Sequence, residues 1–313
     1  MSPALAVAVL AVVIWRLGTG PFVAGLEGID ARALLAAAAI FLVATICAAW
    51  RWTIVSRGLG APLSLPAAVA AYYRAVFLNL LLPAGVAGDV HRGVSHGRQV
   101  DDVSRGLRAV VWERGAGQGV QVVLTIAVLL AFPSPVRSAM PFVAVAVVAV
   151  AVGMALVCRM RGRGFWWTRV RNTVVSDIHN GVLRRSALPA VVLTSVGVTL
   201  GHAATFVVAA RTVGVDAPLS RLLPLAMLAL LAMVLPSIAG WGPREGATAW
   251  VFAAAGLGAE RGAATAVAYG VLVLAASLPG AIVLVVGWLP RHRVSRPGPR
   301  RRVVFRPEGA ADA

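Results

Sequence analysis

The amino-acid sequence consists largely of long apolar stretches separated by short polar connections. A helix of about 20 mostly apolar residues can span the hydrocarbon core of a bilayer. Two further apolar regions, 62–92 and 219–257, are interrupted by internal prolines and glycines. The pattern predicts an all-α polytopic integral membrane protein with about six full transmembrane helices and two interrupted segments. The predicted spans are 3–17, 33–50, 109–132, 139–158, 188–210 and 262–289.

Composition supports this class. Hydrophobic residues make up 59% of the 313 residues and charged residues only 13%, whereas soluble domains carry about 25% charged residues. The first stretch has no basic segment before it, so it is interpreted as a transmembrane helix and not as a signal peptide. The two cysteines, Cys47 and Cys158, lie inside separate apolar helices and indicate neither a disulfide nor a metal site.

The arginines predict the orientation in the membrane. All 29 basic residues are arginine, and 19 of them fall in alternate connections and in the C-terminal tail. Cytoplasmic connections of membrane proteins carry an excess of basic residues. We therefore expect a multi-pass protein of the cell membrane, inner or plasma, with both termini in the cytoplasm. Residues 1–289 form the predicted membrane domain, and the Arg/Pro-rich residues 290–313 form a predicted disordered cytoplasmic tail.

This orientation constrains the two interrupted regions. Region 62–92 begins and ends on the cytoplasmic side, and region 219–257 begins and ends outside, so each is predicted to be a re-entrant helical hairpin. Non-helical backbone at membrane depth requires surrounding protein or a water-filled cavity. We therefore expect both tips to be buried at a site. The predicted hairpin breaks are Pro83, Gly85 and Gly88 in the first region and Pro236, Gly240 and Gly242 in the second.

The order of helix, helix, hairpin, helix occurs twice, approximately in residues 1–132 and 139–289. The first copy starts inside and the second outside, which is an inverted-topology repeat. In transporters built on this plan, substrate sites lie where the two interrupted segments meet near the membrane midplane.

Ionisable residues within membrane segments are costly and are candidates for function by default. Arginine side chains present a planar set of donors that suits phosphate, and helices restarting after the breaks would direct N–H groups toward an anion. An equally simple interpretation makes Asp89–Arg92 and Arg244–Glu245 structural ion pairs that fix the hairpins. His202 is interpreted as an interhelical hydrogen-bonding residue. The candidate substrate-binding residues are Arg74, Asn79, Asp89, Arg92, Glu113, Arg114, Arg244 and Glu245.

Motifs of common enzymes are absent from the sequence, including G-x-S-x-G, H-E-x-x-H and the phosphate-binding loop. We therefore predict a protein that is not an enzyme and that uses no cofactor and no metal. The net charge of +17 is compatible with nucleic acid, but the sequence has neither interleaved aromatic residues nor a soluble fold to bind it.

Several short motifs occur in a recognisable order. The second half contains Pro236, Gly240, Gly242 and Glu245, followed by an Ala-rich helix through Tyr269. The first half contains Arg74-x-x-Phe77-x-Asn79, Leu82-Pro83-Ala84-Gly85-Val86-Ala87-Gly88-Asp89-x-x-Arg92 and Val111-Trp112-Glu113-Arg114. Over residues 1–289 this set resembles the lysylphosphatidylglycerol synthase transmembrane (flippase-like) family. The resemblance implies the membrane module without the soluble aminoacyl-transferase domain, a module linked to moving lipids between leaflets.

The leading expectation is a lipid translocator whose hairpins form a polar cavity near the midplane. Its arginines would attract an anionic or zwitterionic headgroup, and its carboxylates would hold the arginines or recognise a cationic headgroup. Two alternatives stay open: a membrane subunit or enzyme of lipid or lipid-linked glycan modification, and an ion-coupled transporter of small solutes. The expected partners are membrane lipids with a charged headgroup and a soluble biosynthetic enzyme, and the oligomeric state is left open.

Overall fold

The computed structural model describes residues 20–82, 85–159, 165–233 and 242–288. Within these ranges the chain is helical and contains no strand. The helices are α2 (Gly20–Glu27), α3 (Ala31–Gly58), α4 (Leu65–Leu81), α5 (Ala87–Gln99), α6 (Val103–Ala131), the 3₁₀ turn η1 (Arg137–Ala139), α7 (Met140–Arg159), α8 (Phe165–Gly181), α9 (Leu188–Thr212), α10 (Leu219–Ala232), α11 (Pro243–Ala254), α12 (Ala259–Ser277) and α13 (Pro279–Trp288).

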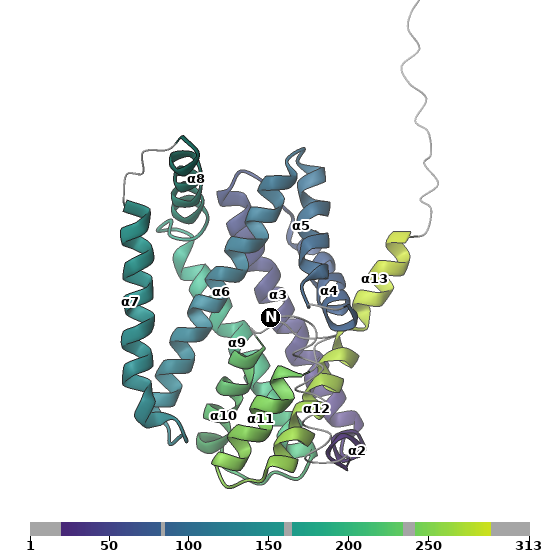
Figure 1. Ribbon diagram of the computed structural model, residues 1–313. Helices are drawn as coiled ribbons and strands as arrows, with labels where there is room; N and C mark the ends of the chain where they lie inside the picture. The colour runs from purple at the N-terminus through teal and green to yellow at the C-terminus, as the bar shows by residue number, and fades with distance from the viewer. Residues whose placement is uncertain (1–19, 83–84, 160–164, 234–241, 289–313) are drawn as a thin grey trace, which may run out of the picture.

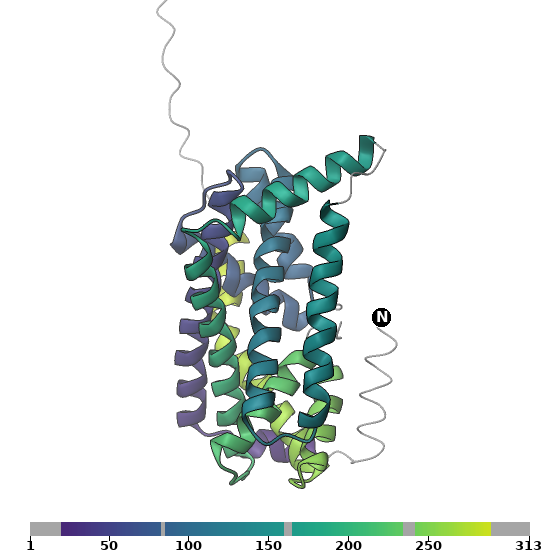
Figure 2. The ribbon, with the colours of Figure 1, turned by 90° about the vertical axis from the view of Figure 1, so that its left-hand side faces the viewer.

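Five of these stretches are long and apolar enough to cross a bilayer. Most of them run along a common axis, as Figures 1 and 2 show. This confirms the predicted class of an all-α polytopic membrane protein. The sixth predicted helix, 3–17, and the predicted tail, 290–313, lie outside the described residues. The five stretches are Ala31–Gly58, Val103–Ala131, Arg137–Leu156, Leu188–Thr212 and Ala259–Val286.

Some of the apolar helices are buried in the bundle, whereas others expose their apolar side chains at its surface. The main core lies between α3, α9, α10 and α12, where Phe206 and Tyr269 are fully buried. Helix α7 instead carries exposed apolar side chains, among them Phe142 at 77% and Val145 at 69% of full exposure. An apolar helix exposed in this way is stable in lipid, because lipid has no water to order around it.

Local sequence sets several helix boundaries. Asp30 caps α3 by accepting a hydrogen bond from the N–H of Ala33 at 2.8 Å, and Asp102 caps α6 by accepting one from the N–H of Arg105 at 2.8 Å. Such caps satisfy backbone donors that have no partner inside the helix. Pro279 begins α13 and divides the predicted helix 262–289 after Ser277.

Two pairs of short helices, α4–α5 and α10–α11, lie in opposite halves of the bundle (Figure 1). Each pair stands between two long helices in the sequence, so the order long, short, short, long in 31–131 recurs in 188–277. Each predicted hairpin region therefore contains a real break. Entry of the two pairs into a bilayer from opposite faces, and the inverted repeat itself, stay predictions.

The described glycines of the breaks have distinct roles. Gly85 has φ +62° and Gly242 has φ +113°, conformations that glycine adopts without a Cβ clash. Gly88 is where α5 touches α4: a Cβ added there would lie 2.0 Å from the carbonyl oxygen of Ala75. Pro83, Pro236 and Gly240 lie outside the described residues.

Replacing Gly88 with alanine should separate α4 from α5 and lower the stability of the protein by about 1–3 kcal/mol, the usual cost of overpacking. The obstacle is backbone, which cannot rotate away as a side chain could. The melting temperature in detergent, followed by size-exclusion chromatography after heating, measures this loss. Gly115→Ala is the matched control, because a Cβ at Gly115 meets nothing within 4 Å. Equal melting temperatures for the two variants would contradict the packing described.

The predicted end of the second helix is wrong, and one predicted connection contains an additional helix. The helix predicted to end at residue 50 continues to Gly58, so Arg51 lies within α3 and is only 5% exposed. The connection between residues 159 and 185 contains the helix α8, which crosses one end of the bundle (Figure 2). Asp177 of α8 accepts a hydrogen bond from Arg108 Nε at 2.8 Å, which ties α8 to α6.

Candidate functional site

Glu113 is the centre of a buried ion network. It lies on α6 and is 0% exposed. Its Oε1 accepts hydrogen bonds from Arg51 Nε at 2.9 Å and from the Tyr72 hydroxyl at 2.6 Å. Its Oε2 accepts one from Arg92 Nη2 at 2.7 Å. One carboxylate therefore joins α3, α4, α5 and α6, and charged hydrogen bonds of this kind are the stronger ones in proteins.

Asp89 forms a second centre in the first turn of α5. Its Oδ1 accepts from Arg92 Nε at 2.9 Å, and its Oδ2 accepts from Arg114 Nη2 at 2.5 Å and from Asn79 Nδ2 at 2.9 Å. Asn79 Oδ1 accepts in turn from the N–H of Gly88 at 2.7 Å. The start of α5 is thus held against the end of α4 by side chains that the sequence had placed at the break.

The network carries a net positive charge. Three arginines, Arg51, Arg92 and Arg114, meet two carboxylates, Asp89 and Glu113. A buried charge is tolerated only when it is paired and hydrogen-bonded. The guanidinium of Arg92 also lies 4.2 Å from the ring centre of Tyr72 and 4.7 Å from that of Trp52, which adds cation–π attraction.

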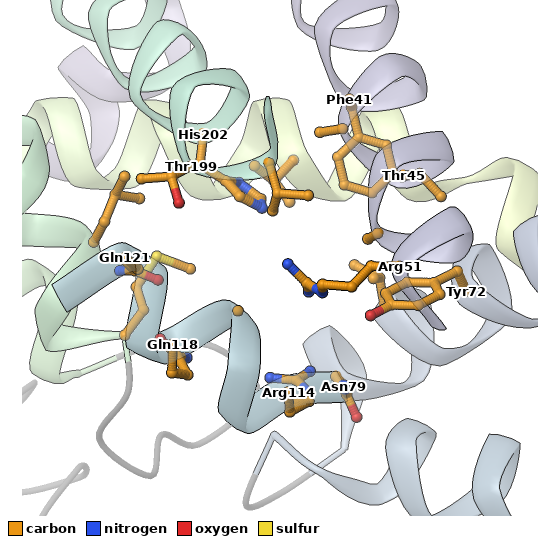
Figure 3. Close-up of a pocket in the computed structure, with 18 of the residues that line it drawn as sticks. Phe41, Thr45, Arg51, Tyr72, Asn79, Arg114, Gln118, Gln121, Thr199 and His202 are labelled. Carbon is orange, nitrogen blue, oxygen red and sulfur yellow. The ribbon is translucent and has the colours of Figure 1, made fainter. Parts of the chain in front are cut away.

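A cavity of about 260 Å³ adjoins this network. Figure 3 shows Arg51 reaching into it, with Arg114 and Asn79 along one side and Thr199 and His202 along the opposite side. The described ends of both hairpins reach this cavity. Its lining consists of Phe41, Ala44, Thr45, Ala48, Arg51, Tyr72, Val76, Asn79, Leu80, Gly85, Arg114, Gly117, Gln118, Gln121, Val198, Thr199, His202, Leu230, Met233 and Val273.

Arg51 is held in its position from two sides. Its Nη1 donates to Ser195 Oγ of α9 at 3.0 Å, while its other nitrogens bind Glu113. Gly117 leaves the space for the guanidinium, because a Cβ there would lie 2.7 Å from Arg51 Nη1. The guanidinium is therefore pre-organised at the cavity wall before any ligand arrives.

The charges of the second hairpin are paired with each other. Arg244 Nε donates to Glu245 Oε1 at 3.0 Å, and Glu245 Oε2 accepts from the N–H of Gly242 at 2.6 Å. Both side chains are buried, and neither lines the cavity. The guanidinium of Arg244 lies 5.2 Å from the ring centre of Tyr269, whose hydroxyl is hydrogen-bonded to His202 Nδ1 at 2.9 Å. Tyr269 thus links Arg244 to His202 of the cavity wall, and His202 has the interhelical role expected for that residue.

The structure thus separates the eight candidate residues into three groups and one isolated residue. Asn79 and Arg114 line the cavity, whereas Asp89, Arg92 and Glu113 form the ion network beside it. Arg244 and Glu245 stabilise the start of α11. Arg74 is half-buried on α4, does not line the cavity, and has no ion-pair partner among the described residues.

Sequence reasoning missed Arg51 and Tyr72. Arg51 is one of the 19 arginines that the sequence assigns to the cytoplasmic connections and tail, although Trp52, Ile54 and Val55 continue the apolar run beyond it. Tyr72 is absent from the predicted site residues, but it is buried on α4 and donates a hydrogen bond to Glu113. In the described ranges, no group of three His, Cys, Asp or Glu residues is placed to hold a metal ion.

A comparison with models of protein families gives a match over most of the chain. The family model described as the lysylphosphatidylglycerol synthase TM region matches residues 3–280. Neither the search of curated proteins nor the search of solved structures found a match.

Proposed function

The chain belongs to the family of the lysylphosphatidylglycerol synthase transmembrane region, and from that premise we propose that it moves a lipid with a charged headgroup between the leaflets of the membrane. Membership places it among membrane proteins connected with lipid modification or translocation. Translocation is the narrower function proposed here, and synthesis of the lipid is assigned to a separate, soluble enzyme.

The observation that carries the proposal is the cavity between the two hairpins. Two guanidinium groups, those of Arg51 and Arg114, line it within a bundle whose outer surface is largely apolar. Arginine presents several donors in a plane that matches the oxygens of phosphate. A phosphate-bearing headgroup would therefore find in the cavity the hydrogen bonds that it loses on leaving water.

The size of the cavity supports transport of a headgroup and not of a whole lipid. Pockets that enclose drug-sized ligands measure roughly 300–1,000 Å³, and this cavity measures about 260 Å³. A headgroup fits this volume, whereas acyl chains would remain in the surrounding bilayer. A polar path for the headgroup removes the main barrier to crossing, which is the desolvation of charge in hydrocarbon.

We propose further that the arginine-rich end faces the cytoplasm of a cell membrane. The end of the bundle that α8 crosses also holds the C-terminal ends of α3 and α5 (Figures 1 and 2). These three elements carry the exposed Arg57, Arg98 and Arg169. Anionic lipids of the cytoplasmic leaflet attract such basic groups. The opposite end combines Arg211 with Asp216, joined by a hydrogen bond of 3.0 Å.

Reconstitution into liposomes tests the function. Vesicles containing the purified chain and a trace of tail-labelled phospholipid are treated with a membrane-impermeant quencher. Without protein, only label in the outer leaflet should be quenched. With the protein, label from the inner leaflet should also become accessible. The panel covers anionic, zwitterionic and cationic headgroups, and failure to move any of them would overturn the proposal.

A further inference from the structure

The cavity wall contains cations and neutral polar groups but no carboxylate. Among its lining residues in the described ranges, Arg51 and Arg114 are the arginines, and neither aspartate nor glutamate occurs. Segments 83–84 and 234–241, which connect the helices of the two hairpins, also contain no Asp or Glu in the sequence. A cationic group entering the cavity would therefore meet positive charge without a carboxylate in direct contact.

The nearest carboxylates are already engaged by protein donors. Each oxygen of Glu113 and each oxygen of Asp89 accepts at least one hydrogen bond from a buried partner. These side chains are 0% and 6% exposed. Recruiting either of them for an ammonium group would release an arginine into a site that already holds more arginines than carboxylates. The option that these acids recognise a cationic headgroup is therefore disfavoured.

Neutral hydrogen-bonding side chains complete the cavity. Gln118, Gln121, Thr199 and His202 line it beside and opposite Arg51 (Figure 3). The Oε1 atom of Gln118 is buried and has no hydrogen-bond partner among the described residues. The Thr199 hydroxyl donates to the carbonyl oxygen of Ser195 at 3.0 Å, so its oxygen is still able to accept. Groups of this kind bind hydroxyls, which both donate and accept.

On the premise of the proposed function, we propose that the cavity selects lipids whose headgroup is an anionic phosphodiester carrying neutral hydroxyl groups. Such a headgroup places its phosphate against Arg51 and Arg114 and its hydroxyls against Gln118, Gln121, Thr199 and His202. An aminoacylated headgroup, with its added ammonium charge, is disfavoured. In the terms of the family's name, this chain prefers the unmodified substrate of lysylphosphatidylglycerol synthesis to its product.

Transport rates of lipids that share one labelled tail test this selectivity. Phosphatidylglycerol should cross at least about tenfold faster than lysylphosphatidylglycerol, a difference of ~1.4 kcal/mol in barrier height. Equal rates, or faster lysylphosphatidylglycerol, would overturn the selectivity and leave lipid transport intact. Movement of no lipid at all would overturn the proposed function and this inference together. A parallel experiment supplies the vesicles with soluble glycerophosphoglycerol. If this compound is taken up while no lipid moves, the ligand of the cavity is a free phosphodiester and not a lipid headgroup.

A variant that adds a carboxylate to the wall gives a second readout. Gln118→Glu keeps the size of the side chain and adds a carboxylate to the cavity wall. An ammonium group could pair with this carboxylate, whereas the wild-type wall offers it no such partner. It should narrow the rate difference between the two lipids at least about threefold. The matched control is Gln99→Glu, which makes the same change at an exposed position at the end of α5. An unchanged ratio in Gln118→Glu would overturn the assignment of selectivity to this cavity.

Discussion

Replacement of Glu113 by glutamine should cost about 3–5 kcal/mol of stability, the usual loss when one partner of a buried ion pair is removed. The amide is close in size to the carboxylate, so packing changes little. The change leaves Arg51, Arg92 and Arg114 with Asp89 as the single carboxylate of the network. The network would then hold two excess positive charges, and two of its three arginines, Arg51 and Arg92, are buried where little solvent can stabilise them.

Thermal unfolding in detergent or nanodiscs measures this effect. The control is Asp216→Asn, which removes the fully exposed partner of Arg211 and should leave stability nearly unchanged, because solvent screens such a surface pair. Adding Arg51→Met to Glu113→Gln removes one excess charge and should restore part of the lost stability. Similar melting temperatures for Glu113→Gln and Asp216→Asn would show that the network contributes little to folding.

Replacement of Arg51 by alanine is expected to reduce transport strongly while leaving the fold in place. Glu113 keeps its hydrogen bonds from Arg92 and Tyr72, so no buried carboxylate is left unpaired. The cavity loses one of its two guanidinium groups. Hydrogen bonds to charged groups contribute about 1.5–3 kcal/mol each, so the transport rate should fall roughly ten- to hundredfold.

The liposome assay measures the rate, and circular dichroism with size-exclusion chromatography checks that the variant is folded. Arg57→Ala is the matched control, because Arg57 lies on the same helix but is exposed at its end. Arg51→Lys retains the charge without the planar arrangement of donors, so its rate should fall between those of wild type and Arg51→Ala. Transport by Arg51→Ala at the rate of Arg57→Ala would remove Arg51 from the proposed site.

Much of the fold was predictable because lipid imposes simple requirements. Apolar length identified five of the stretches that the structure describes as long enough to span. Proline and glycine identified the interruptions between Leu81 and Ala87 and between Ala232 and Pro243. The amphipathic helix α8 was missed because its arginines were interpreted only as a signal of orientation, although basic residues are compatible with a helix.

The site was less predictable than the fold. Sequence proximity suggested Asp89 with Arg92, which do form a pair, but the other partners of these groups lie far away in the chain. Glu113 pairs with Arg51, 62 residues earlier. Counting the arginines outside apolar segments cannot identify Arg51 as a site residue. Its burial depends on two partners from distant helices, Glu113 of α6 and Ser195 of α9. Long-range packing decides these contacts, and local pattern carries little information about it.

Because the guanidinium of Arg51 is pre-organised, the free energy needed to remove it from water is spent during folding and not during transport. Removing a charged group from water is unfavourable, and for Arg51 this happens once, when the protein folds around Glu113 and Ser195. A headgroup that later reaches the cavity meets a side chain that has already lost its hydration shell. Little solvent has to be reorganised on the protein side in each cycle, so the remaining barrier should depend chiefly on the hydration of the headgroup itself.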